Sequence, residues 1–230
     1  MSTVVEGLAD EGVLLASTPE VLGQVRTDGT EMTLWQRQLD PELGNWLDTL
    51  PSAAMPRLRI ELPVVECVLA LHAACHAAGT PGGPLRDAFV DDVFALAHRF
   101  ARIARQAHPD GSSRLRLRLD VVDDDACRRW HRDCVPLRLL CTYRGPGTDW
   151  VLPADADMAM RAPDDDLGHA RRMNTHEVAV FKGCGFPGSQ QVAHDTGIVH
   201  RSPRISGSGI TRLVLCLEPV RDGKLAEVKA

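Results

Sequence analysis

Two histidines and one aspartate in the C-terminal half of the chain have the residue types and spacing of a metal site. His131 and Asp133 are separated by one residue, so on an extended chain both side chains point to the same face. His200 stands far downstream, at the end of the apolar run Ile198–His200. His-x-Asp on one strand and a distant histidine on another form the two-histidine-one-carboxylate pattern, which holds Fe(II) and leaves coordination positions open. The sequence therefore predicts that His131, Asp133 and His200 bind a divalent metal.

A basic residue follows this triad where a co-substrate would need it. In iron/2-oxoglutarate oxygenases, an arginine or lysine opens the strand after the second histidine and pairs with the co-substrate carboxylate. Arg212 opens the strand expected at Arg212–Leu217, and a guanidinium binds a carboxylate through two parallel hydrogen bonds. We therefore predict an Fe(II)/2-oxoglutarate-dependent oxygenase in which Arg212, or Arg204, anchors 2-oxoglutarate. Arg138 or Tyr143 would help to position it.

Other interpretations of the same residues remain open. Zinc is the competing metal, because Cys127 and Cys134 supply softer ligands near His131, and Cys184 or His194 could complete a tetrahedral site. In that case the protein would be a non-catalytic zinc-binding protein. A third possibility is a protein that has kept the β-barrel fold of such oxygenases and no longer binds a metal.

The elements that must position these residues fall into two groups. Helical periodicity predicts helices over Pro41–Leu50, which Asp40 can cap, and over Val64–Ala78 and Asp87–Gln106. After Gly111 the apolar period changes to two, which is typical of half-buried strands. The expected strands are Leu115–Val121, Leu137–Tyr143, Trp150–Leu152, Val178–Phe181, Ile198–His200 and Arg212–Leu217.

This order of elements predicts an α+β fold. N-terminal helices would pack on a C-terminal double-stranded β-helix, a jelly-roll or cupin-like barrel. We expect a single domain over residues 1–230, with a mainly helical layer in residues 1–110. Residues 111–230 would form the barrel and carry the metal site.

Composition narrows the functional classes. The net charge of −5, with both signs interleaved, argues against a nucleic-acid or membrane partner. Seven cysteines, an odd number without a CxxC pair, argue against a secreted disulfide framework. The segment Met1–Asp10 has neither the basic nor the apolar part of a signal peptide. We therefore expect a cytoplasmic protein that acts on a small molecule, and the helical half could mediate a homodimer.

Several strings together carry a family resemblance. They are Trp35-Gln-Arg37, Trp130-His-Arg-Asp133, Tyr143-Arg-Gly-Pro-Gly-Thr148, Phe181-Lys-Gly183, His200-Arg-Ser-Pro203 and Arg212-Leu213. With these strings the chain resembles the bacterial domain-of-unknown-function family 1826. Members are associated with metal-homeostasis gene neighbourhoods, especially those for zinc. The resemblance therefore implies a metal-related role without deciding the chemistry.

Overall fold

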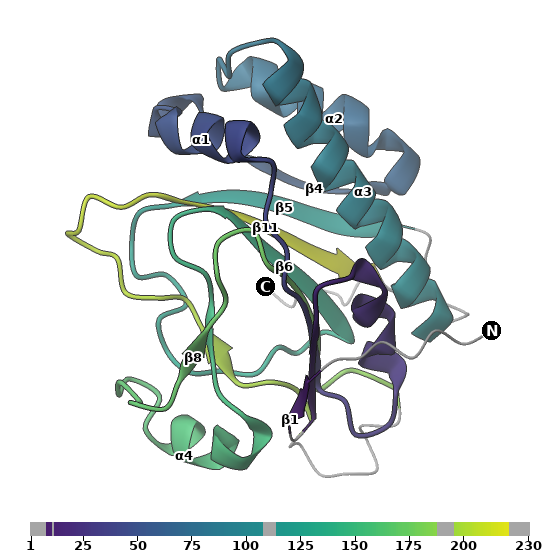
Figure 1. Cartoon of the computed structure of the whole chain (residues 1–230), viewed down its shortest axis with the longest axis vertical. Helices are drawn as coiled ribbons and strands as arrows, with labels where there is room; N and C mark the ends of the chain where they lie inside the picture. Colours follow the sequence, from purple (N-terminus) through teal and green to yellow (C-terminus); the bar gives the residue numbers. More distant parts are fainter. Residues whose placement is uncertain (1–7, 11, 108–113, 188–195, 221–230) are drawn as a thin grey trace, which may run out of the picture.

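The computed structural model describes residues 8–10, 12–107, 114–187 and 196–220, which form an α+β fold around one large sheet (Figure 1). The strands of this eight-stranded sheet follow the order β1-β2-β3-β9-β6-β11-β5-β4. Only β2 and β3 pair in parallel, and the other neighbours are antiparallel. In sheet order, the strands are Leu8–Asp10, Val13–Ala16, Met32–Trp35, Val178–Lys182, Leu137–Arg144, Arg212–Pro219, Arg114–Val122 and Leu58–Pro63.

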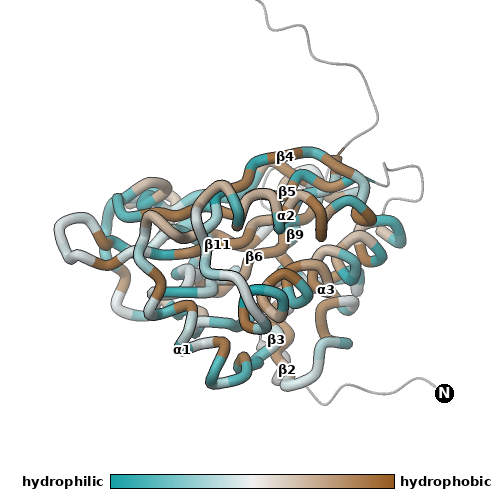
Figure 2. The backbone as a smooth tube through the Cα atoms, turned by 90° about the horizontal axis from the view of Figure 1, so that it is seen from above, coloured by the Kyte–Doolittle hydropathy of each residue, from teal (hydrophilic) through white to brown (hydrophobic). Residues whose placement is uncertain are grey.

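Helices cover one face of the large sheet. Figure 1 shows α1, α2 and α3 together on that side, and Figure 2 shows hydrophobic and hydrophilic residues alternating along α3. None of the helices in the described ranges combines the length and apolarity that crossing a bilayer requires. The helices are α1 (Pro41–Thr49), α2 (Cys67–Ala77), α3 (Pro84–Ala107) and α4 (Ala156–Arg161), with short 3-10 turns at Pro19–Arg26, Ser52–Ala54, Val64–Glu66 and Pro153–Asp155.

The central strands separate apolar and charged side chains onto the two faces of the sheet. Successive strand residues point to opposite sides, so Leu115, Leu117 and Leu119 of β5 enter the core beneath the helices. Arg116 and Arg118 lie between them and point the other way. The register pairs Arg118 with Cys216 of β11, which places that cysteine on the charged side as well. The main core therefore forms between the sheet and α1–α3.

A second, smaller sheet covers part of the opposite face. It has the order β10-β7-β8 and consists of His200–Arg201, Asp149–Trp150 and Arg171–Arg172. Trp150 packs there with Leu140, Phe181 and Cys216 of the large sheet in a separate apolar cluster. The charged face of β5 and β11 thus lies beside the small sheet, away from the helices.

The three predicted helices are present with shifted ends, as are four of the six strands predicted after residue 111. The strands predicted at Trp150–Leu152 and Ile198–His200 share only Trp150 and His200 with β7 and β10. The prediction that residues 1–110 form mainly a helical layer is incomplete, because this range also supplies β1–β4. Of these, β3 lies between β2 and β9 inside the large sheet. These strands have at most six residues, and β3 is buried along nearly its whole length, so they lack the extended alternation that marks a half-buried strand.

Replacing the N-terminal cap of α1 should lower the free energy of unfolding. The Asp40 carboxylate accepts hydrogen bonds from the backbone amides of Glu42 and Leu43. We expect Asp40→Ala to destabilise the protein by about 0.5–2 kcal/mol in urea denaturation, because these amides then lose their partner. Asp40→Asn keeps the cap and should change stability much less. Equal losses in both variants would contradict the capping role.

Candidate metal centre

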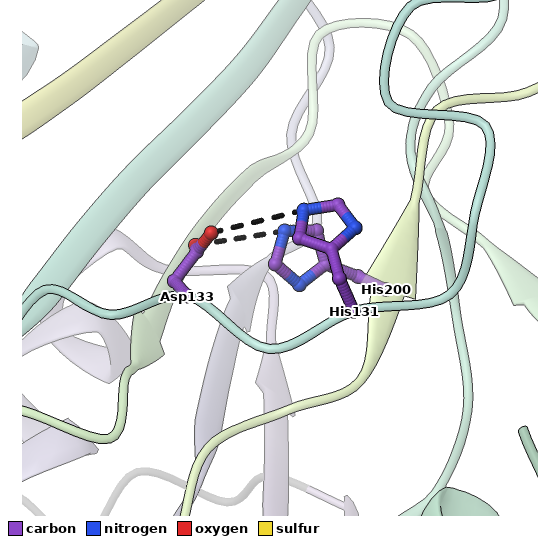
Figure 3. A group of neighbouring side chains, drawn as sticks. All are labelled: His131, Asp133 and His200. Carbon is purple, nitrogen blue, oxygen red and sulfur yellow. Dashed lines mark ion pairs between the residues drawn. The ribbon is translucent and has the colours of Figure 1, made fainter. Parts of the chain in front are cut away.

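The fold brings the three predicted ligands together. His131 and Asp133 lie in the segment between β5 and β6, and His200 begins β10. The backbones of His131 and His200 form an antiparallel pair, each amide donating to the other's carbonyl over 3.0 Å. Figure 3 shows the two imidazoles lying side by side and facing the Asp133 carboxylate. One potential ligand atom from each residue lies within 4.8 Å of the other two.

Backbone carbonyls orient both imidazole rings. Nδ1 of His131 lies 2.8 Å from the carbonyl oxygen of Arg129, and Nδ1 of His200 lies 3.2 Å from that of Ile198. A carbonyl oxygen only accepts hydrogen bonds, so each Nδ1 carries a hydrogen and each neutral ring keeps its lone pair on Nε2. Burial lowers the pKa of His200 to about 4, which favours the neutral, ligating form.

The Asp133 carboxylate is engaged at one oxygen only. Its Oδ1 accepts a hydrogen bond from Nη1 of Arg138, whereas its Oδ2 is buried without a hydrogen-bond partner. This Oδ2 lies 3.5 Å from Nε2 of His200, and Oδ1 lies 3.8 Å from Nε2 of His131. Nitrogen lone pairs and a carboxylate oxygen facing one another repel unless a cation lies between them. The orphaned oxygen therefore fits a bound metal ion.

The distances from the Asp133 carboxylate to the two imidazoles also suit one ion. Two atoms that each bind a metal at about 2.1 Å can be at most about 4.2 Å apart. Both separations between Asp133 and a histidine fall below that limit. Two nitrogen donors and one oxygen donor are the ligand set of facial-triad Fe(II) sites, which leaves other positions open.

A row of alternating charges supports Asp133 from behind. Arg138 of β6 binds Asp133 with Nη1 and Glu218 of β11 with Nε and Nη2. Glu218 also accepts from Arg116 of β5, which in turn binds Glu61 of β4. The ion pairs along these strands thus hold the Arg138 guanidinium in place, and Arg138 in turn orients the Asp133 carboxylate.

The two histidines of the triad line a pocket of about 170 Å³ on the charged face of the large sheet. Strands β4, β5, β6 and β11 line it together with the segment before His131. Four of the lining residues are arginines and one is an acid, so the pocket suits a small anion. The lining comprises Arg59, Arg118, Asp120, Val122, Ala126, Cys127, His131, Arg138, Leu140, Thr148, His200, Ser202, Arg212, Val214 and Cys216.

Arg212 reaches this pocket as a buried cation without a countercharge in contact. It is 2 % exposed, and its guanidinium donates to the carbonyl of Pro146 over 2.7 Å and to the hydroxyl of Thr142 over 3.5 Å. In the described ranges, no carboxylate forms an ion pair with it. Burial lowers its pKa to about 10, although the charge of Asp149 acts in the opposite direction. An anionic ligand would supply the missing charge.

The other two predicted helpers lie elsewhere. Tyr143 does not face the metal ligands, because it lies five positions after Arg138 on β6 and therefore points to the helix side. There its hydroxyl donates to Asp92 of α3 over 2.5 Å. Arg204 does not line the pocket, since its guanidinium binds the carbonyl of Asp164 and lies 3.6 Å from Asp166. Sequence distance does not reveal which face of β6 Tyr143 occupies, nor that Arg204 lies outside the strands.

The cysteines predicted as zinc ligands do not join the triad. In the part of the chain that the structure describes, the group of potential ligands contains no thiol. Cys127 lines the pocket without belonging to that group, and Cys134 is exposed. His194, the other candidate fourth ligand, lies outside the described residues.

Sequence reasoning missed Arg59, Arg118 and Glu218 as residues of this region. The alternation along Leu115–Val121 predicts a half-buried strand, but it does not say what lies against its other face. Only the order β6-β11-β5-β4 places it beside the triad.

The family comparison gives a clear result. Residues 16–218 match the family described as "Protein of unknown function (DUF1826)". The chain belongs to this family. The match spans most of the chain, so it includes both the triad and Arg212. A comparison of this DUF1826 chain with curated proteins gives no match.

Two solved structures are similar in outline to this DUF1826 protein. One is a full-length protein of Neurospora crassa in complex with alpha-KG, with a TM-score of 0.41 and 10% identity over 98% of this chain and 89% of that chain. The other is a prolyl-4-hydroxylase of Pseudomonas putida, with a TM-score of 0.36 and 17% identity over 81% of this chain and 97% of that chain. Because both TM-scores are low, neither structure defines the chemistry of this chain.

Removing the guanidinium behind Asp133 should weaken metal binding. We expect Arg138→Met to raise the dissociation constant for Mn(II) by about 10–100-fold, because the carboxylate loses the group that orients it. Isothermal titration calorimetry measures this constant. Arg116→Met is the matched control: Arg116 also binds Glu218, but it does not touch Asp133. Equal effects of the two substitutions would show that Arg138 has no specific role.

Tyr143→Phe should affect stability and leave metal binding unchanged. The substitution removes a hydrogen bond to Asp92, which also binds Arg37 through two contacts. Because this bond ends on a charged group, the free energy of unfolding should fall by about 1.5–3 kcal/mol in urea denaturation. A large loss of metal affinity in the folded variant would show instead that Tyr143 contributes to the metal site.

Proposed function

We propose that this protein is a non-haem Fe(II)/2-oxoglutarate-dependent oxygenase that acts on a small molecule. The observation that carries the proposal is the orphaned Asp133 Oδ2 beside the Nε2 atom of His200, with the His131 imidazole alongside. A second observation joins it: the uncompensated Arg212 lines the same pocket. The two large parts of such a site, a metal-binding triad and a carboxylate anchor, thus meet in one cavity.

Each residue would have a defined task. His131, Asp133 and His200 would hold the iron, which when bound supplies the activation of O₂. In the overall reaction, a substrate C–H becomes C–OH, and 2-oxoglutarate becomes succinate and CO₂. One oxygen atom of O₂ enters the new hydroxyl group and the other enters succinate. Arg212 would bind the far carboxylate of 2-oxoglutarate, and Thr142 would steady the Arg212 guanidinium. Arg138 would orient Asp133 and keep its Oδ2 turned to the metal.

The arrangement of the sheets supports a finer description of the fold. The large sheet and the small β10-β7-β8 sheet pack against each other through a shared apolar cluster. The triad lies where His200 of the small sheet meets the segment leading to β6. We therefore propose that the two sheets together form a double-stranded β-helix.

The proposal predicts iron-dependent binding and turnover of 2-oxoglutarate. Protein purified anaerobically without a metal-affinity tag should bind one Fe(II), and His131→Ala/His200→Ala should abolish this binding. In air, the loaded protein should convert 2-oxoglutarate into succinate slowly even without substrate. Arg212→Met should raise the dissociation constant for 2-oxoglutarate by roughly tenfold or more, because a charge-assisted hydrogen bond is lost.

Controls separate this outcome from general damage. His76→Ala removes an exposed histidine of α2 and should leave both metal content and turnover unchanged. Stoichiometric zinc that resists exchange, with no affinity for 2-oxoglutarate, would favour the zinc-binding alternative and overturn the oxygenase. Failure of the wild type to bind any divalent metal would overturn both.

A further inference from the structure

The pocket has a second cationic end that neither the triad nor the 2-oxoglutarate anchor uses. Arg118 of β5 and Arg59 of β4 both line it. The register pairs Arg59 with Arg118, and Arg118 with Cys216 of β11, so the three residues form one row on the charged face. Arg59 is largely exposed and Arg118 is about one-third exposed, which places this end toward the mouth of the pocket.

This end is separate from Arg212. Along β11, Arg212 pairs with Val122, whereas Cys216 pairs with Arg118. Four residues of strand separate the two pairs, which corresponds to about 13 Å. One carboxylate held against Arg212 is therefore not the natural partner of Arg118. A second anionic group would be needed to occupy the second end.

The charges at this end are incompletely balanced. Asp120 is shared, because its Oδ1 accepts from Nε of Arg59 over 2.7 Å and its Oδ2 lies 3.8 Å from Nε of Arg118. That Nε of Arg118 is buried and has no hydrogen-bond partner. The Nη2 of Arg118 donates a hydrogen bond to Sγ of Cys216 over 3.3 Å, and a thiol sulfur is a weak acceptor. One carboxylate thus faces two guanidinium groups.

The neighbouring acids make their hydrogen bonds to other arginines, although the charge of Glu218 also raises the pKa of Arg118. Glu218 binds Arg138 and Arg116, and Asp133 binds Arg138. Arg59 and Arg118 carry two positive charges and Asp120 carries one negative charge, so one further negative charge would balance these three side chains. A carboxylate has this charge, whereas a phosphate dianion would exceed it.

We propose that Arg118 and Arg59 form a carboxylate-binding subsite, so that the molecule oxidised in this pocket is a small organic acid. The identity of the substrate class rests on the proposed oxygenase function. Binding of the carboxylate itself requires only the two arginines, not the metal. Arg118 holds the carboxylate with its partly exposed guanidinium, and Arg59 closes the subsite from the mouth.

The test uses butyrate as a probe and butyramide as its neutral isostere. Thermal unfolding of the full chain is followed at constant ionic strength, first without metal. Butyrate should raise the midpoint, since a ligand of the native state stabilises it, and butyramide should not. Arg118→Gln and Arg59→Gln should each weaken butyrate roughly tenfold or more, because each removes a charge-assisted hydrogen bond. Arg57→Gln, which removes an exposed charge outside the pocket, should retain the response.

Further variants identify the end that responds. Because Arg212 is another carboxylate site, the titration is repeated in Arg212→Met, where the response should persist until Arg118→Gln is added. A response that vanishes in Arg212→Met and survives in Arg118→Gln would overturn the subsite, as would equal responses to butyrate and butyramide. Arg59→Gln alters an exposed side chain, so it remains informative if Arg118→Gln fails to fold.

The subsite and the oxygenase can fail separately. In His131→Ala/His200→Ala, the response to butyrate should remain. Such a response without any turnover of 2-oxoglutarate would keep the subsite and reject the oxygenase. Turnover of 2-oxoglutarate without an Arg118-dependent response would do the reverse.

Discussion

The site depends on a pair of backbone hydrogen bonds between His131 and His200. These bonds join the segment that leads into β6 to the first residue of β10 in the small sheet. Because they are made by the backbone, they fix the distance between the two histidines whatever their side chains do. Each imidazole is then turned by a carbonyl two residues before it. The result is two ring nitrogens presented in the same direction, with Asp133 opposite them.

The large sheet supplies the second constraint, through the alternation of its side chains. On the helix side, leucines of β5, β6 and β11 form the main core. On the other side, the same strands carry Arg118, Arg138, Glu218 and Arg212. The face of the sheet under the helices thus forms the apolar core, and the opposite face carries the charged residues of the candidate site. The row of ion pairs from Glu61 to Asp133 reduces the cost of holding charges on this partly buried face. Arg212 has no ion-pair partner there in the described ranges, and the Nε of Arg118 has no hydrogen-bond partner.

Much of the candidate triad could be predicted from the sequence, because the His-x-Asp spacing and the strand pattern before His200 are local features. Arg212 could be predicted as well, since it opens a strand with clear alternation. Tyr143 was misplaced because distance along the chain says nothing about which face of a strand a residue occupies. Arg204 was misplaced because it lies outside the strands and binds Asp164 instead. Strands β1–β4 were missed because they lack an extended alternation, and β3 is buried along nearly its whole length. The order of strands in the sheet, which places Arg118 and Arg59 at the pocket, has no local signal.

Anomalous diffraction from crystals soaked anaerobically with Fe(II) tests the central claim most directly. The iron-edge difference map should show one strong peak between Nε2 of His131, Nε2 of His200 and the Asp133 carboxylate, about 2.0–2.2 Å from each ligand atom. A peak at that position would establish that the orphaned Asp133 oxygen belongs to a metal site. A well-ordered triad without a peak, or a peak on the cysteines instead, would contradict the account.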